Sequence, residues 1–310
     1  MQKKNEIRIG TRGSRLALWQ ANWIKESLES KDKDLSVSLI KIKTTGDKIL
    51  DVPLARVGGK GLFVKEIEEA LMDGKIDIAV HSIKDVPTDL PDPLHLPVIC
   101  KREDPRDALI SRGLKFSEMP QGAKIGTSSL RRQAQLLHLR SDLKMVTLRG
   151  NLDTRIRKLD TEGLDAVILA AAGIRRMGWG DKITELLSPE ISLPAIGQGA
   201  VGIECRREDP WINSQIAFLL HPDTYDAVSS ERALLKRLEG GCQVPIAAYA
   251  EIENHTMRLR GLVGSVDGKT LIRDEIMGPR TRGESLGVKL AERLLEAGAD
   301  KILEEVYKQR

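Results

Sequence analysis

The sequence lacks what several classes of protein need. Aromatic residues make up only 3% of its 310 residues, and the formal net charge is only +4. Both values argue against a nucleic-acid partner, because bases are bound by aromatic stacking and phosphates by clustered cations. No apolar run approaches the roughly 20 residues that a membrane-spanning helix needs, and the start, MQKKNEIRIG, has no apolar signal segment. We therefore expect a cytoplasmic protein with no membrane partner.

Cysteine is also scarce. The chain has three cysteines, Cys100, Cys205 and Cys242, and none is in a Cys-x-x-Cys pair. An odd number without that spacing argues against both a disulfide framework and a structural zinc site, so we predict no metal. At least one thiol is expected to be free.

What the sequence does contain is an alternation of strand and helix patterns in its first third. This β-α-β order indicates a parallel or mixed sheet covered by helices, and therefore an α/β fold. Strands are expected at 6–10, 37–42 and 76–82, and helices from Ser14 onward and at 63–72.

The same order restarts after PTDLPDPLHLP, which we interpret as a proline-rich bend. Strands are expected at 124–126, 143–148 and 165–171, with helices at 128–139 and 151–160. A strand at 200–205 is positioned to return the chain to the first lobe. From about residue 222 the pattern changes to a helix, three strands near 243–252, 257–265 and 269–277, and a last helix with Leu286, Leu290 and Leu294 on one face. The expected domains are 1–101 with 199–220, 102–198, and 221–310.

Two strand-to-helix turns resemble each other, GTRGSRLALWQ at Gly10 and GTSSLRRQAQL at Gly126. Helix N-termini attract anions, and arginines beside them can grip carboxylates in a bidentate manner. Arg149 and Arg155 follow in LRGNLDTR. Ordinary N-caps with solvated arginines would explain either turn alone, whereas the two together favour a carboxylate or phosphate site in a cleft between two lobes.

A second group of polar residues lies in AVHSIKDVP, at the carboxyl end of an expected strand. Lys84 and Asp85 offer a cation and a carboxylate there, although a solvated surface pair has the same pattern. His81 has a plain alternative too, as a strand-end histidine bonded to backbone. We interpret VGGKGLFVKE as a loop in which Lys60 and Phe63 close over the cleft, or as a plain surface loop.

Cys242 stands in LEGGCQVPIA, at an expected helix-to-strand bend. A packing cysteine, a hydrolytic nucleophile with His81 as its base, and a thiol that makes one durable covalent bond are all consistent with this position.

Taken together, these blocks resemble the hydroxymethylbilane synthase family, also called porphobilinogen deaminase. The resemblance covers nearly the whole chain and includes the blocks TRGSRLALWQ, GDKILDVPLARVGGKGLFVKEIE, DIAVHSIKDVP, REDPRDA, GTSSLRRQ, LRGNLDTR, LPAIGQGAVGIE and ERALLKRLEGGCQVPIAAYAE. It implies two lobes like type 2 periplasmic binding proteins, which form a cleft, and a small C-terminal α+β domain with a three-stranded antiparallel sheet.

The resemblance also implies an activity. A dipyrromethane cofactor is bound covalently to Cys242, and four porphobilinogen molecules are added head to tail with loss of ammonia, before 1-hydroxymethylbilane is released from what is expected to be a monomer. Asp85 and Arg12 are implied to be catalytic. The residues implied to bind cofactor and substrate are Cys242, Lys84, Asp85, Ser14, Thr127, Ser129, Arg131, Arg132, Arg149, Arg155 and Arg176. A two-lobed binding or sensing module without chemistry is the alternative, and an added covalent mass on the purified chain would exclude it.

Overall fold

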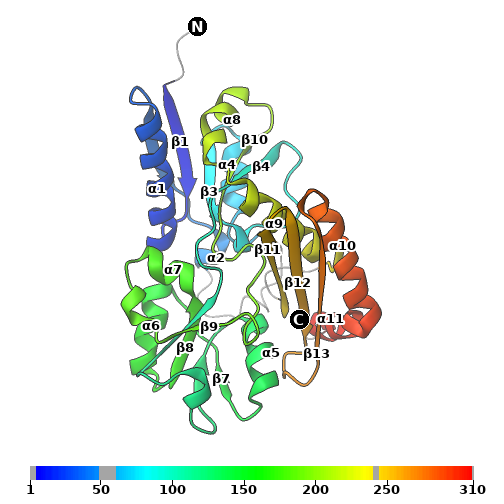
Figure 1. Cartoon of the computed structure of the whole chain (residues 1–310). Helices are drawn as coiled ribbons and strands as arrows, with labels where there is room; N and C mark the ends of the chain where they lie inside the picture. Colours follow the sequence, from blue (N-terminus) through cyan, green and yellow to red (C-terminus); the bar gives the residue numbers. More distant parts are fainter. Residues whose placement is uncertain (1–4, 49–60, 240–243, 309–310) are drawn as a thin grey trace. The chain divides into compact units, whose positions relative to one another are not determined.

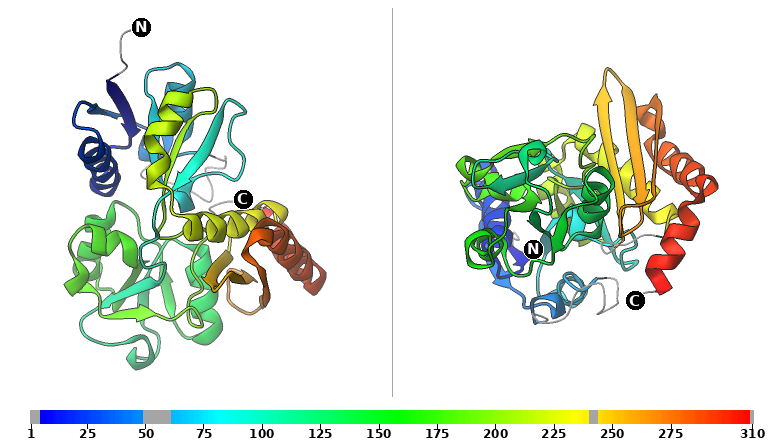
Figure 2. Two further views of the ribbon diagram at one scale, coloured as in Figure 1. Left: turned by 45° about the horizontal axis from the view of Figure 1, so that its top comes forward. Right: turned by 90° about the horizontal axis from the view of Figure 1, so that it is seen from below.

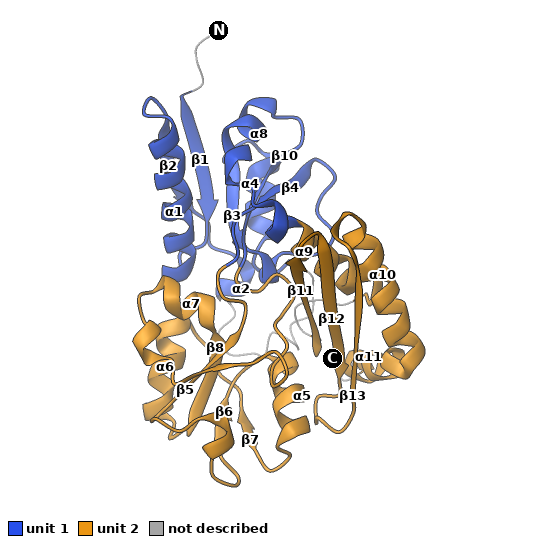
Figure 3. Cartoon of the chain, viewed as in Figure 1, with its two compact units in different colours: residues 1–102, 200–225 blue, residues 103–199, 226–310 orange. Residues whose placement is uncertain are grey.

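The structure, a computed structural model, describes residues 5–48, 61–239 and 244–308. By its internal contacts the chain divides into two compact units, 1–102 with 200–225, and 103–199 with 226–310 (Figure 3). Each unit is described by itself. The division into three domains therefore stays a prediction.

Unit 1 is built on a five-stranded sheet with helices against it (Figure 1). Its strand order is β2-β1-β3-β10-β4, with β1 parallel to β2 and β3, and β10 antiparallel to β3 and β4. The strands are β1 (Glu6–Thr11), β2 (Ser36–Lys41), β3 (Ile78–Ser82), β4 (Leu94–Ile99) and β10 (Val201–Arg206). The helices are α1 (Arg15–Lys31), α2 (Thr45–Lys48), α4 (Lys65–Met72) and α8 (Pro210–Ile216). A single 3-10 turn, η1 (Ile83–Asp85), follows β3 directly.

Strand β4 corrects one interpretation of the sequence. Leu94 to Pro97 was expected to belong to a proline-rich bend, but these residues are in β4. Proline cannot donate a ladder hydrogen bond, so it is tolerated in edge strands. β4 is at the edge of its sheet, beside β10 alone, which is why Pro97 fits there.

Unit 2 contains a second five-stranded sheet with the same plan, in the order β7-β6-β8-β5-β9. Here β6 is parallel to β7 and β8, and β5 is antiparallel to β8 and β9. The strands are β5 (Asp107–Ser111), β6 (Lys124–Gly126), β7 (Lys144–Val146), β8 (Ala166–Ala170) and β9 (Glu185–Leu187). The helices beside it are α5 (Leu130–Leu139), α6 (Leu152–Thr161) and α7 (Ala171–Arg176).

The same unit ends in a three-stranded antiparallel sheet, as predicted, with the order β11-β12-β13. Its elements are α9 (Pro222–Arg237), β11 (Ile246–Glu253), β12 (Thr256–Gly264), β13 (Leu271–Pro279), α10 (Gly283–Leu294) and α11 (Asp300–Lys308). The helices pack on the sheet (Figure 2). The predicted apolar stripe of Leu286, Leu290 and Leu294 is buried in the core that they share with it. The mixed α/β class is confirmed. Across the described residues, no helix combines the length and the apolar character that crossing a membrane would require.

Candidate functional site

The turn from β1 into α1 is fixed by its small residues. A Cβ on Gly10, near the end of β1, would lie 2.2 Å from Cδ1 of Ile76, so a larger residue fits there only if that side chain is displaced. Ser14 is the N-cap of α1, and its hydroxyl accepts a hydrogen bond from the Ala17 N–H at 3.3 Å. The cap explains the helix start and leaves Arg12 just before it.

A small cavity of about 70 Å³ opens at this turn in unit 1. Three predicted site residues, Arg12, Ser14 and Asp85, line it together, and His81 and Phe63 share the wall. Asp85 is half-buried at the end of η1. Among the described residues, none donates a hydrogen bond to its carboxylate or forms an ion pair with it. The carboxylate is therefore available to a cation or to a transferable proton.

Arg12 has its own counter-ion, which the sequence analysis did not identify. Its Nε donates to Oδ1 of Asp47 at 3.1 Å, and its guanidinium lies over the Phe63 ring, 4.1 Å from the centroid. Burial opposes ionisation of Asp47, but the hydrogen bonds and charge of Arg12 outweigh it and lower the pKa of that carboxyl. The pair fixes the direction of the arginine. Lys60, expected to act with Phe63, lies outside the described residues.

The other two polar residues of this segment have different surroundings. Lys84 is half-buried in η1 beside Asp85. The His81 imidazole is bonded to a side chain rather than to backbone, because its Nε2 lies 2.9 Å from Oε2 of Glu204 on β10. A pairing of His81 with Cys242 has no structural support here, since Cys242 lies outside the described residues.

In unit 2 the turn from β6 into α5 repeats the first one. Ser129 is the N-cap of α5, and its hydroxyl accepts from the Arg132 N–H at 3.4 Å. Thr127 is buried, and its hydroxyl accepts from the Ser129 N–H at 3.2 Å. A Cβ on Gly126 would lie 2.6 Å from Cδ1 of Leu148, as crowded as at Gly10. Both serines are therefore the caps that the plainer interpretation expected.

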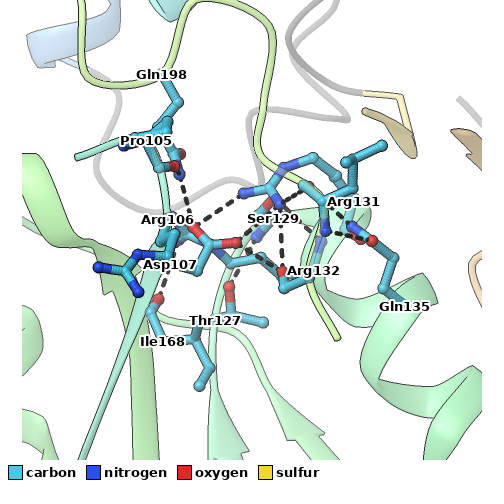
Figure 4. Close-up of polar contacts among 12 residues, drawn as sticks. Pro105, Arg106, Asp107, Thr127, Ser129, Arg131, Arg132, Gln135, Ile168 and Gln198 are labelled. Atoms are coloured by element: carbon cyan, nitrogen blue, oxygen red, sulfur yellow. Dashed lines mark hydrogen bonds and ion pairs between the residues drawn. The ribbon is translucent and has the colours of Figure 1, made fainter. Parts of the chain in front are cut away.

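The arginines of this turn are not solvated. Arg131 is 3% exposed and Arg132 is 6% exposed, and both bind the fully buried Asp107 at the start of β5 (Figure 4). Arg131 Nη1 donates to Asp107 Oδ2 at 2.8 Å, and Arg132 Nη2 donates to Oδ1 at 2.7 Å. Burial disfavours a charged Asp107, but the two guanidinium charges dominate and hold its pKa far below the usual range. Two cations against one anion leave this cluster with an excess positive charge.

Three further arginines that were predicted to belong to the site lie at or near other turns of unit 2. Arg149, after β7, is half-buried, and within the described part of the chain it has neither a hydrogen-bond acceptor nor a counter-ion. Burial lowers its pKa. Arg155 in α6 donates through Nε to the Gly150 carbonyl at 2.8 Å, and Arg176, the last residue of α7, donates to the Gly199 carbonyl at 2.7 Å. Arg149 is the cation of this group that most needs an external anion.

The residues of this turn region fit a ligand with several carboxylates. Besides Arg149, the Nε of Arg131 is buried and has no hydrogen-bond partner among the residues that the structure describes, which leaves donor capacity on a fixed side chain. The cap at Ser129 adds the positive end of a helix to the same region. Bidentate guanidinium groups and a helix N-terminus are the groups that bind carboxylates in proteins.

Comparison with known proteins agrees with this chemistry. The family profile described as "Porphobilinogen deaminase, dipyromethane cofactor binding domain" matches residues 7–214, and "Porphobilinogen deaminase, C-terminal domain" matches residues 225–296. A curated protein named porphobilinogen deaminase from Geobacter metallireducens is 63% identical over 304 residues, which cover 98% of this chain and 96% of that protein. Its counterpart from Pelobacter propionicus is 62% identical over 304 residues, with 98% of each chain covered.

Solved structures give a more distant likeness. The periplasmic aliphatic sulphonate binding protein from Escherichia coli matches 76% of this chain and 71% of its own, at 15% identity and a TM-score of 0.39. A TRAP periplasmic solute binding protein from Chromohalobacter salexigens matches 72% of this chain and 76% of its own, at 13% identity and a TM-score of 0.40.

Proposed function

This chain belongs to the porphobilinogen deaminase family, and from that premise we propose how its residues divide the work. The reaction is a transferase reaction of porphyrin and haem biosynthesis. Four porphobilinogen molecules are joined head to tail, with loss of ammonia, onto a dipyrromethane attached to Cys242, and 1-hydroxymethylbilane is released. Cys242 itself lies outside the described residues.

In unit 1, Asp85 is the proton-transfer group and the anion that stabilises positive charge on a pyrrole. This role is supported by its carboxylate on the cavity wall, which has no ion-pair or hydrogen-bond partner among the described residues. Arg12 holds a carboxylate of incoming porphobilinogen or assists proton transfer, in a direction set by Asp47 and Phe63. Ser14 and Lys84 bind carboxylates beside them. Asp85 can change protonation state, whereas a guanidinium cannot, so Asp85 carries the proton and Arg12 assists only through its charge and hydrogen bonds.

In unit 2, the arginines bind the acetate and propionate groups of the cofactor and of the growing chain. Arg149, Arg155 and Arg176 are the side chains of this group that project from turns and helix ends. The cofactor, when bound, supplies the pyrrole end to which the first substrate is joined. The fixed, largely buried part of the same positive region is formed by Thr127, Ser129, Arg131 and Arg132. The hydrogen bonds of the two arginines to Asp107 hold it in place.

Three further properties belong to the proposal. The chain has three domains, the second and third of which both belong to unit 2. It works as a monomer without nucleic acid, which sedimentation analysis of the purified protein will test. It works in the cytoplasm, where its thiols stay reduced. Cys100 and Cys205 are both unbridged, which supports such a compartment.

The observation that carries the proposed function is the family match over nearly the whole chain. Intact-mass measurement tests it. We expect the purified chain to be heavier than its sequence by one dipyrromethane, and Cys242→Ser to have the bare mass. Cys205→Ser is the matched control and should keep the added mass, because burial raises the pKa of that thiol to about 12 and leaves it unreactive. A native chain of bare mass would instead indicate a binding module without chemistry.

A further inference from the structure

A buried acid–base group stands behind the cavity that Asp85 lines. His81 is on β3 and Glu204 is on β10, the antiparallel neighbour of β3. Their side chains are 5% and 0% exposed, and His81 Nε2 lies 2.9 Å from Glu204 Oε2. Glu68, on α4, is also buried. Burying two carboxyl groups and an imidazole together costs free energy, because each charged form is disfavoured away from water.

The pair differs from another buried carboxylate of the chain, Asp107. Asp107 faces two arginines, which cannot release a proton. Within the described residues Glu204 has only His81 as a hydrogen-bond partner, and its second oxygen, Oε1, is buried without any. In the His81–Glu204 pair, by contrast, the imidazole is a group that can accept and release a proton.

The orientation of the imidazole leaves one ring nitrogen able to accept a proton. Glu204 accepts from Nε2, which fixes the tautomer in which the neutral ring has its lone pair on Nδ1. Nδ1 has no hydrogen-bond partner in the described part of the chain, and His81 lines the cavity with Asp85 and Arg12. A carboxylate on one nitrogen and an open cavity beside the ring is the arrangement of a general base with its orienting residue.

We propose that His81, oriented by Glu204, is a second proton-transfer group of the cavity that Asp85 lines. The inference rests on the proposed role of Asp85. Each condensation forms one C–C bond between a pyrrole carbon and the substrate methylene, and breaks the C–N bond, whose electron pair leaves with nitrogen as ammonia. One proton must reach the nitrogen and one must leave the pyrrole carbon. Asp85 gives the first, His81 accepts the second, and exchange with solvent resets both.

Charged groups on neighbouring elements act on the His81–Glu204 pair or line the cavity beside it. Glu68 on α4 interacts electrostatically with both members of the pair, and Asp85 on η1 and Arg12 after β1 line the cavity with His81. Burial first, and the charge of Glu204 second, raise the pKa of Glu68 to about 7, while His81 opposes the shift. Glu68 therefore changes its charge near neutral pH, where it alters the potential at the His81–Glu204 pair.

The test combines kinetics with a direct view of the imidazole. His81→Asn should lower kcat for porphobilinogen by roughly 100-fold, within the range for loss of a general base, with KM changed less than about threefold. His95→Asn is the control, because His95 is on β4 of the same sheet and does not line the cavity. Glu204→Gln should lower kcat as well, because the imidazole loses the carboxylate that fixes its tautomer.

Nitrogen-15 NMR tests the tautomer without turnover. The chain has only five histidines, so the His81 signals are those lost in His81→Asn. We expect a proton on Nε2 and none on Nδ1 of the neutral ring in the native chain, and a mixture of the two tautomers in Glu204→Gln. A His81→Asn enzyme within threefold of the native kcat, or a ring that carries its proton on Nδ1, would overturn the inference. Neither result touches the proposed function, which falls only if Cys242 carries no added mass.

Discussion

Asp107→Asn replaces the one anion that two buried arginines share. The carboxylate accepts hydrogen bonds from both guanidinium groups, and also from Ser192 Oγ at 2.7 Å and Gln198 Nε2 at 2.9 Å. Asparagine keeps the shape but not the charge, and its NH₂ would face donors. Because removing one partner from a buried ion pair costs about 3–5 kcal/mol, we expect a loss of that size in the free energy of unfolding.

The pH of the measurement follows from the sign of the pKa shift. The pKa of Asp107 is lowered in the folded chain, so its stabilising contribution is complete above the ordinary aspartate range and is lost only as the pH falls through that range and below it. At pH 7 the whole effect is present. With a urea m-value of about 3 kcal/mol/M, the midpoint should fall by about 1–2 M.

The assay is urea unfolding followed by circular dichroism at pH 7. Asp142→Asn is the matched control in the same unit, because Asp142 forms a partly exposed pair with Arg140. That pair is screened by solvent, so the control should leave the midpoint close to native. Equal midpoints for Asp107→Asn and Asp142→Asn would refute the reasoning that Asp107 balances the two arginines.

Two predictions concern carboxyl groups of unit 1. Asp85→Ala should lower 1-hydroxymethylbilane formation by roughly 10²–10⁴-fold without loss of fold. The control is Asp92→Ala, in the exposed segment that follows, which should retain native activity. A near-native rate for Asp85→Ala would contradict its role. Since the pKa of Glu68 is raised from 4.5 to about 7, the folded chain keeps that proton between these values and its stability falls as the pH rises through them. Glu68→Gln should remove this dependence of stability on pH. If the difference in urea midpoint between native and variant chains is the same at pH 5 and at pH 8, the prediction is wrong.

The elements and the two turns could be predicted because their determinants are local. The pattern of apolar residues located α1 and α4, and the serines before α1 and α5 indicated where these two helices begin. Three strands were expected in the C-terminal region, and the resemblance implied the antiparallel sheet that they form. Cap residues and periodicity need only a few neighbours along the chain, which is why the sequence specifies them.

The partners of the site residues could not be predicted, because they come from distant segments. REDPRDA contains three acidic residues, and nothing local indicates that Asp107 is the one that is fully buried. Asp47 and Glu204 were missed for the same reason, since each meets its partner only through strand order. The special role of Cys242 came from family resemblance, as its neighbouring residues left three explanations open.

The position of β10 has a consequence for synthesis on the ribosome. β10 lies between β3 and β4 in the first sheet, although about 100 residues separate it from β4 in the chain. At roughly 5–20 residues per second, β4 is made many seconds before the strand that joins it to the sheet. During this time the nascent amino-terminal segment lacks the strand that lies between β3 and β4, and chaperones can bind it.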